Sequence, residues 1–232
     1  MTHVGDLEVA AGDAVASPTP PARVQPGSVG IFGGTFDPIH HGHLAIAEEA
    51  RETLGLERVL FIPAAEPPHK PGRPVAPAAH RLAMVELAIA DNPAFAGSDV
   101  ELVRGGASYT VDTLEALRAD GLVEPWLILS AEALAGFPTW REPERVLDLA
   151  RLAIVPRAGH EVLDAAWLEA RFPGCGTRAA FLPGPLLPIS GSVVRRRAAV
   201  GRSVRYLVPD AVAAYITQHR LYTGPEWRIP QT

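Results

Sequence analysis

The chain has 232 residues, a formal net charge of −5 at pH 7 and one cysteine, Cys175. The acidic balance argues against a globally basic nucleic-acid-binding protein, and a single cysteine permits no internal disulfide, which favours a reducing compartment. Apolar residues make up 47% of the chain, which suffices for a full core, and no stretch approaches the roughly 20 apolar residues of a membrane-spanning helix. We therefore expect a cytoplasmic globular protein without nucleic-acid or membrane partners; the composition carries no signal for an oligomeric state.

The two ends of the chain differ from its middle. Residues 1–26 are rich in Ala, Pro and small polar residues and lack the basic start and continuous apolar stretch of a signal peptide. We expect a disordered leader there, with a partner-binding tail as the alternative. Residues 27–222 form one expected domain, followed by a tail at 223–232.

Short β-rich runs alternate with amphipathic helical stretches along the domain. Strands are predicted at 28–33, 58–63, 98–103, 126–130 and 151–156. Helices are predicted at 42–54, 80–91, 109–120 and 143–150, with a short helical stretch after residue 130 and two further helices between residues 190 and 222. The alternation predicts an α/β fold, a Rossmann-like doubly wound parallel sheet of about five or six strands with C-terminal helices. Ligands of such sheets bind beyond the carboxyl ends of the strands.

The string IFGGTFDPIHHGH, residues 31–43, follows the first predicted strand. Gly33 and Gly34 allow backbone amides to approach a ligand closely, and the helix beginning near His41 directs its amides and dipole to the same place, which favours phosphate. His40 and His43 could both reach one phosphoryl group and donate hydrogen bonds to it. Alternatively, the two histidines cap the helix or bind zinc with a third ligand, although no Cys or His cluster elsewhere has ligand spacing.

The segment HHGH, His40–His43, resembles the (H/T)-x-G-H signature of the nucleotidylyltransferase superfamily, and GGTFDPIHHGH is most similar to the bacterial nicotinate-nucleotide adenylyltransferase family. The resemblance extends from about Ser28 to Tyr222. It implies transfer of the adenylyl group of ATP to nicotinate mononucleotide, giving nicotinate adenine dinucleotide and pyrophosphate, in NAD biosynthesis. It also implies Mg²⁺ carried with ATP and no dedicated metal site in the protein.

The resemblance implies a set of ATP-binding residues in two segments. ISGSVVRRR, from Ile189, is similar to the family's C-terminal motif, usually ISSTxIR; a hydroxyl from Ser192 and the guanidinium of Arg195 would grip the phosphates. A solvated basic helix face is the alternative, expected for Arg196 or Arg197. His40, His43 and Arg195 are the expected catalytic residues. The expected ATP-binding residues are Gly33, Gly34, Phe36, His40, His43, Ser190, Ser192 and Arg195.

The residues that the resemblance places at nicotinate mononucleotide are Thr35, Lys70, Thr110, Glu132 and Trp140. Lys70 belongs to PPHK, and its alternative is an exposed loop lysine. Thr110 belongs to SYTVDTL, where Ser108 or Thr110 could also cap the helix. Trp140 would stack on the pyridine ring, with ordinary packing as its alternative.

Two segments depart from the family pattern. Ser130–Glu132 reads SAE where the family usually has Gly-Ala-Asp, and Gly191 replaces a hydroxyl-bearing residue of the ATP motif. The alternatives are therefore a transferase for nicotinamide mononucleotide, phosphopantetheine or a phospho-alcohol, or a degenerate paralogue that binds nucleotide without turnover.

Overall fold

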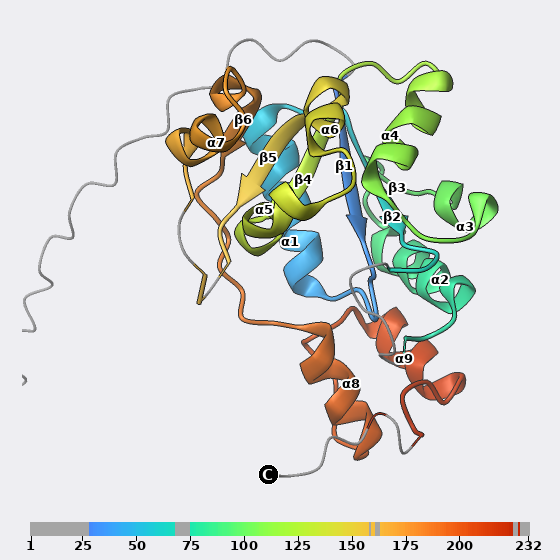
Figure 1. Cartoon of the computed structure of the whole chain (residues 1–232). Helices are drawn as coiled ribbons and strands as arrows, with labels where there is room; N and C mark the ends of the chain where they lie inside the picture. Colours follow the sequence, from blue (N-terminus) through green and yellow to red (C-terminus); the bar gives the residue numbers. More distant parts are fainter. Residues whose placement is uncertain (1–27, 68–74, 158, 161–162, 225–226, 228–232) are drawn as a thin grey trace, which may run out of the picture.

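The computed structural model describes residues 28–67, 75–157, 159–160, 163–224 and 227, which form a central sheet flanked by helices (Figure 1). All strand pairings are parallel, and the strand order is β3-β2-β1-β4-β5-β6. The strands are β1 (Val29–Gly34), β2 (Arg58–Pro63), β3 (Phe95–Gly97), β4 (Trp126–Ser130), β5 (Arg151–Val155) and β6 (Ala179–Phe181). The order reverses between β1 and β4, so the expected doubly wound sheet is confirmed, and its switch point lies beyond the carboxyl ends of these two strands.

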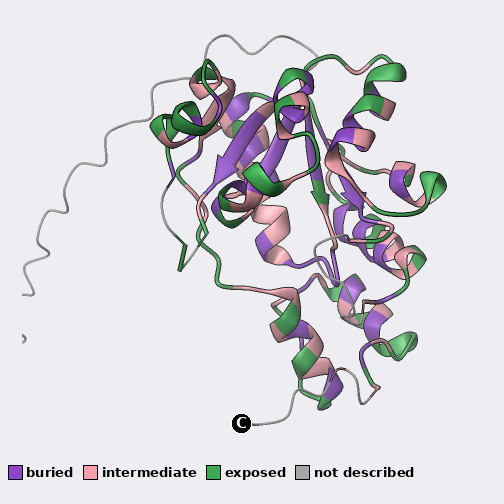
Figure 2. Cartoon of the chain, in the orientation of Figure 1, coloured by how far each residue is buried: buried purple, intermediate pink, exposed green. Residues whose placement is uncertain are grey.

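Helices cover both faces of the sheet because successive strand side chains point to opposite sides. The helices are α1 (His41–Leu54), α2 (Ala78–Ile89), α3 (Val100–Arg104), α4 (Thr110–Ala119), α5 (Ala131–Gly136), α6 (Pro143–Leu149), α7 (Ala165–Arg171), α8 (Gly191–Ala199) and α9 (Asp210–Gln218). Phe32 and Phe61 pack on one face against α1, α2 and α9, whereas Ile31 and Ile62 pack on the other against α4, α5, α6 and α7. Figure 2 shows the strands largely buried between these layers. No helix in the described part of the chain is long and apolar enough to cross a membrane.

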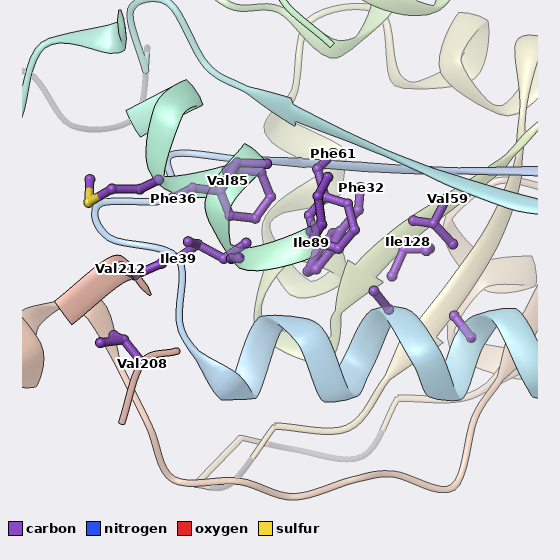
Figure 3. Close-up of a cluster of buried hydrophobic side chains, with 14 of the residues drawn as sticks. Phe32, Phe36, Ile39, Val59, Phe61, Val85, Ile89, Ile128, Val208 and Val212 are labelled. Atoms are coloured by element: carbon purple, nitrogen blue, oxygen red, sulfur yellow. The ribbon is translucent and has the colours of Figure 1, made fainter. Parts of the chain in front are cut away.

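The two C-terminal helices lie beyond the carboxyl end of β1 (Figure 1). Val208 and Val212 belong to the same buried cluster as Phe36 and Ile39 from the turn between β1 and α1 (Figure 3). Burying a side chain of this size stabilises a fold by about 1.5–3 kcal/mol. The end of the chain is thereby fixed against the turn that carries the histidine motif.

The predicted third strand, residues 98–103, is wrong. The strand is β3, Phe95–Gly97, and residues Val100–Arg104 form the short helix α3. Val-Glu-Leu-Val suggested a strand because it mixes apolar and charged residues, but the exposure is reversed: Val103 is 78% exposed and Glu101 is buried. Asn92 starts the strand earlier, since its side chain accepts from the Ala94 backbone N–H at 3.0 Å.

The segment between β5 and α8 contains an α-helix and a strand that the periodicity did not predict, α7 and β6. Both are short, seven and three residues, and periodicity is weak over such lengths. The usable signal was Asp164, whose carboxylate accepts from the Trp167 N–H at 2.8 Å and begins α7. β6 completes the sheet as its sixth strand.

Candidate active site

The turn after β1 brings backbone close to solvent at the switch point. Gly33 is exposed, and a Cβ added there would meet no atom within 4 Å. Phe36 has a left-handed φ of 47°, yet its ring is 1% exposed and lies edge-on to the His43 ring with centroids 5.1 Å apart. The Phe36 ring therefore supports His43 from the core, and any contact of Phe36 with ATP has to come from its backbone.

His40 and His43 form a locked pair at the start of α1. His40 occupies the N-cap position, and its backbone N–H donates to Nδ1 of His43 at 3.2 Å. The two rings stack with centroids 3.7 Å apart. Because Nδ1 of His43 accepts a hydrogen bond, the proton of its neutral ring lies on Nε2. Burial, together with the positive charge of Arg157, lowers the pKa of His40 to about 4, so His40 is neutral at pH 7.

The helix start itself offers fewer amides than the sequence suggested. The His41 N–H, the first of α1, donates to the Leu207 carbonyl at 3.1 Å, and the His43 N–H donates to the His40 carbonyl at 2.9 Å. Leu207, in the segment before α9, thus occupies the His41 N–H, which is no longer available to a ligand. The side chains of the histidine pair therefore remain the main polar groups that α1 presents.

A second helix, α8, brings the predicted phosphate ligands to the same turn. Ser190 caps α8 by accepting from the Val193 N–H at 3.3 Å. Arg195 donates through Nη2 to Ser192 Oγ at 3.2 Å and through Nη1 to the Asp37 carbonyl at 2.6 Å. The fold thus brings Ser190, Ser192 and Arg195 beside the histidine turn, although they are about 150 residues further along the chain.

The approach of α8 to this turn explains the glycine that departs from the family pattern. A Cβ on Gly191 would lie 2.7 Å from the Asp37 carbonyl oxygen and 3.2 Å from Nη1 of Arg195. A hydroxyl-bearing residue would push Asp37 or α8 away. The missing side chain therefore allows the Arg195 contact with Asp37.

Three cavities lie around the turn between β1 and α1, and two of them share the histidine pair. A polar cavity of about 190 Å³ is lined by Thr35, Asp37, His40, His43, Arg157, Ser190, Ser192 and Arg195. A cavity of about 170 Å³ opens on its Thr35 side and is lined by Gly33, Gly34, Tyr109, Thr110, Trp140 and apolar strand residues. A third, of about 230 Å³, shares both histidines with the polar cavity and is lined further by Ile46, Ser130, Arg157 and Ile189. The predicted residues therefore divide between the polar cavity and the cavity lined by Tyr109, Thr110 and Trp140, which we call the aromatic arm.

The aromatic arm ends at the start of α4. Tyr109 holds the N-cap position without a side-chain cap, so the expected cap by Ser108 or Thr110 is wrong. Ser108 Oγ instead accepts from the Ala65 N–H at 2.8 Å and fixes the loop after β2. The first-turn amides of α4 thus have no side-chain cap, and Thr110 of this turn lines the cavity opposite Trp140.

One predicted substrate residue of the described chain, Glu132, is not brought into these cavities. Glu132 is 51% exposed and pairs through Oε2 with Nε of Arg157 at 2.9 Å, without lining the three cavities. Ser130, its neighbour in the SAE segment, caps α5 by accepting from the Ala133 N–H at 3.2 Å. Lys70 lies outside the described residues, as does the leader 1–26. Both altered residues of SAE have structural partners.

Sequence reasoning missed Arg81, which is 1% exposed in α2. Its guanidinium donates to the carbonyls of Ala76, Thr35 and Ala65 at 2.8, 2.9 and 3.1 Å. These bonds tie the loop after β1 to the chain after β2. A charged residue among the apolar positions of a predicted helix was the available signal, because a buried arginine needs several acceptors.

The zinc alternative has no third ligand among the residues that the structure describes. Within the described residues, no group of three or more His, Cys, Asp or Glu side chains is arranged to hold a metal ion. Asp37 is the carboxylate beside the histidines; its Oδ1 accepts from Ala76 N–H and Tyr222 Oη–H, and its Oδ2 faces Arg195 at 3.6 Å.

A polar cavity at the switch point of a doubly wound parallel sheet is the mark of nucleotide-binding α/β proteins, and this molecule has that architecture. Residues 31–197 match the cytidylyltransferase-like family model, and the chain belongs to this family.

Named relatives match most of the chain. A protein of Roseiflexus sp. (strain RS-1), named probable nicotinate-nucleotide adenylyltransferase, is 53% identical over 194 residues, 84% of this chain and 97% of that protein. A protein of Thermomicrobium roseum with the same name is 49% identical over 203 residues, 87% of this chain and 94% of that protein. The solved structure of Plasmodium falciparum nicotinic acid mononucleotide adenylyltransferase complexed with NaAD is similar with a TM-score of 0.70 at 19% identity, over 84% of this chain and 97% of that chain. This likeness supports the fold.

Proposed function

We infer that the protein is an adenylyltransferase that joins nicotinate mononucleotide to ATP and releases nicotinate adenine dinucleotide and pyrophosphate, a step of NAD biosynthesis. The observation that carries this conclusion is the polar cavity with the histidine pair and Arg195, which opens on one side into an aromatic arm at Trp140. The names of relatives at 53% and 49% identity support the same activity.

The reaction needs little covalent chemistry from the protein. The phosphate of the mononucleotide attacks the α-phosphorus of ATP in line, and pyrophosphate leaves. A phosphate monoester is already nucleophilic at neutral pH, so positioning and charge stabilisation provide most of the catalysis. Neutral His40 and the Nε2–H of His43 donate hydrogen bonds to the charge that develops on the α-phosphoryl group. Ser192 and Arg195 hold the leaving pyrophosphate.

The aromatic arm suits the pyridine ring of the acceptor. Trp140 and Tyr109 line this cavity and offer ring faces, and Thr35 and Thr110 add hydroxyls. A helix start without a side-chain cap attracts an anion, so α4 favours the carboxylate of nicotinate over the neutral amide of nicotinamide. The family resemblance also assigns to Lys70, which lies outside the described residues, the role of a positive charge for the mononucleotide phosphate.

The third cavity suits the adenosine. Ile46 and Ile189 provide apolar walls, and Arg157 stands where this cavity meets the polar one. Glu132 contributes through its ion pair with Arg157, at 2.9 Å, and holds that guanidinium at the cavity mouth. The glutamate side chain is one methylene longer than the aspartate usual in the family, and its ion pair with Arg157 holds Glu132 outside the three cavities.

Mg²⁺ enters as part of the substrate, bound to the phosphates of ATP. Among the described residues, Asp37 is the carboxylate that lines the polar cavity; it is 5% exposed, and both of its oxygens face protein donors, so it is a poor ligand for the ion. Mg²⁺ would neutralise phosphate charge in the bound nucleotide.

The activity is tested by pyrophosphate release with Mg²⁺–ATP and either nicotinate or nicotinamide mononucleotide. We expect faster turnover with the nicotinate form, since the α4 start prefers an anion. Equal or faster turnover of the nicotinamide form would contradict the acceptor assignment. Turnover of neither acceptor by a folded protein that binds ATP would contradict the proposed activity.

A further inference from the structure

Asp37 is a junction between four segments of the chain. It lies in the β1–α1 turn and is 5% exposed. Its Oδ1 accepts from the Ala76 N–H at 3.2 Å and from the Tyr222 hydroxyl at 2.8 Å. Its Oδ2 lies 3.6 Å from Nη1 of Arg195, and its carbonyl accepts from the same nitrogen at 2.6 Å. The chain before α2, helix α8 and the turn after α9 are thus all fastened to one carboxylate residue.

Tyr222 is held firmly in its place at this junction. The residue is 2% exposed and has a left-handed φ of 64°. Burial, together with the negative charge of Asp37, raises the pKa of its phenol far above the ordinary value, so the hydroxyl keeps its proton and remains a donor. The hydroxyl therefore donates to the Asp37 carboxylate at 2.8 Å and orients it.

Trp227 extends the same arrangement to the guanidinium. Its ring lies edge-on to the Tyr222 ring with centroids 5.0 Å apart, and the guanidinium carbon of Arg195 lies 5.5 Å from the Trp227 ring centroid. With Nη1 on Asp37 and Nη2 on Ser192 Oγ, the fork of Arg195 has one defined orientation. Such fixing matters because a free arginine side chain has many rotamers, whereas a preorganised fork loses little freedom on binding phosphate.

We propose that Tyr222 and Trp227, near the end of the chain, are positioning residues that aim Arg195 at the β- and γ-phosphates of ATP. Tyr222 acts through Asp37, and Trp227 acts on the guanidinium directly. Neither residue lines the three cavities. The proposal rests on the proposed function for the identity of the leaving group, but its contacts predict tighter binding of ATP even where no acceptor turns over.

The test compares Tyr222→Phe with Tyr215→Phe, a matched control on α9 whose hydroxyl bonds Nδ1 of His80 at 2.9 Å, away from Asp37. Calorimetric titration with Mg²⁺–ATP measures Kd for both variants. We expect Tyr222→Phe to weaken ATP binding about tenfold, as for loss of a hydrogen bond to a charged group, and Tyr215→Phe to leave Kd unchanged. In turnover assays, KM for ATP rises with Tyr222→Phe while KM for the mononucleotide stays constant.

A cycle with Arg195→Ala separates positioning from general stability. If Tyr222 acts through Arg195, Tyr222→Phe has no further effect on the ATP Kd once Arg195 is absent. The same Tyr222→Phe effect with and without Arg195, or equal weakening by the two tyrosine variants, would overturn the proposal. If the Kd values follow the expected pattern but the protein turns over no mononucleotide, the positioning role stands and the proposed function is refuted.

Trp227 is tested in parallel against a second matched control. Trp167 lies under the Arg171 guanidinium at 4.0 Å on α7, away from the site. Trp227→Leu weakens ATP binding about threefold, the size of a partly exposed cation–π contact, whereas Trp167→Leu does not. Unchanged ATP binding by Trp227→Leu would remove Trp227 from the proposal.

Discussion

Replacing His43 distinguishes a helix cap from a catalytic donor. His43 has two connections: its Nδ1 accepts from the His40 N–H at 3.2 Å, and its neutral ring carries a proton on Nε2 beside the polar cavity. His43→Ala removes both. His43→Gln keeps the first, because a glutamine at the third helical position reaches back to the N-cap N–H, but it cannot place a donor where Nε2 stood.

The magnitudes follow from these two contacts. Loss of one preorganised donor to a transition state costs about 100- to 1,000-fold in kcat. Loss of an N-terminal capping interaction costs about 1 kcal/mol of stability, which lowers Tm by roughly 2–4 °C for a protein of this size. We expect His43→Ala to show both losses. His43→Gln should unfold near the wild-type temperature and still lose most of its kcat.

The assay is pyrophosphate release under saturating Mg²⁺–ATP and nicotinate mononucleotide, with thermal unfolding followed on the same samples. The comparison of the two variants decides the role of His43. Wild-type kcat in His43→Gln would show that His43 only caps α1, and the assigned charge stabilisation would be refuted.

Three further outcomes are expected. Gly191→Ser should raise KM for ATP and lower Tm, because the new Cβ would lie 2.7 Å from the Asp37 carbonyl; unchanged values would show that α8 shifts without consequence. The pKa of His40 falls from 6.5 in the unfolded chain to about 4 in the fold. As the pH falls from about 6.5 towards 4, the unfolded state therefore takes up a proton that the folded state does not. The fold loses roughly 3 kcal/mol of stability over this range. Urea unfolding across this range should show that loss, and His40→Asn, which keeps a good N-cap residue, should reduce it; an equal loss in the variant would assign it to other groups. Trp140→Ala should raise KM for the mononucleotide about three- to tenfold through loss of ring stacking and leave KM for ATP unchanged, whereas a rise in both would indicate general loosening of the site.

Local pattern predicted most of the sheet because unbroken apolar runs leave little choice of structure. β2 and β4 begin and end where the sequence predicted. The errors concern elements of three to seven residues, where one turn of helix and a short strand bury similar side chains. Tertiary pairing decides there: Phe95 pairs with Val59 of β2 and fixes β3 ahead of the predicted position.

In the site, too, local motifs could be read from the sequence, whereas long-range contacts could not. Backbone chemistry and family resemblance located the glycine turn, the histidine pair and Arg195. They did not reveal the Asp37–Tyr222 bond, which joins residues 185 positions apart, because no local pattern carries a contact of that range. Arg81 was missed for a related reason, since its acceptors are backbone carbonyls that any sequence would provide. The structure also explains Gly42: a Cβ at this position would lie 3.1 Å from Nδ1 of His40 and would crowd that ring.

The packing of Val208 and Val212 onto the Phe36 turn has a consequence during protein synthesis (Figure 3). Translation proceeds at about 5–20 residues per second, so roughly 10–40 seconds separate the synthesis of His43 from that of Tyr222. Until Val208 and Val212 are synthesised, Phe36 and Ile39 of this turn lack the side chains that cover them in the fold. A chain that ends before residue 208 would therefore expose an apolar turn beside the histidine pair, and exposed apolar surface of this kind makes incomplete chains prone to aggregate.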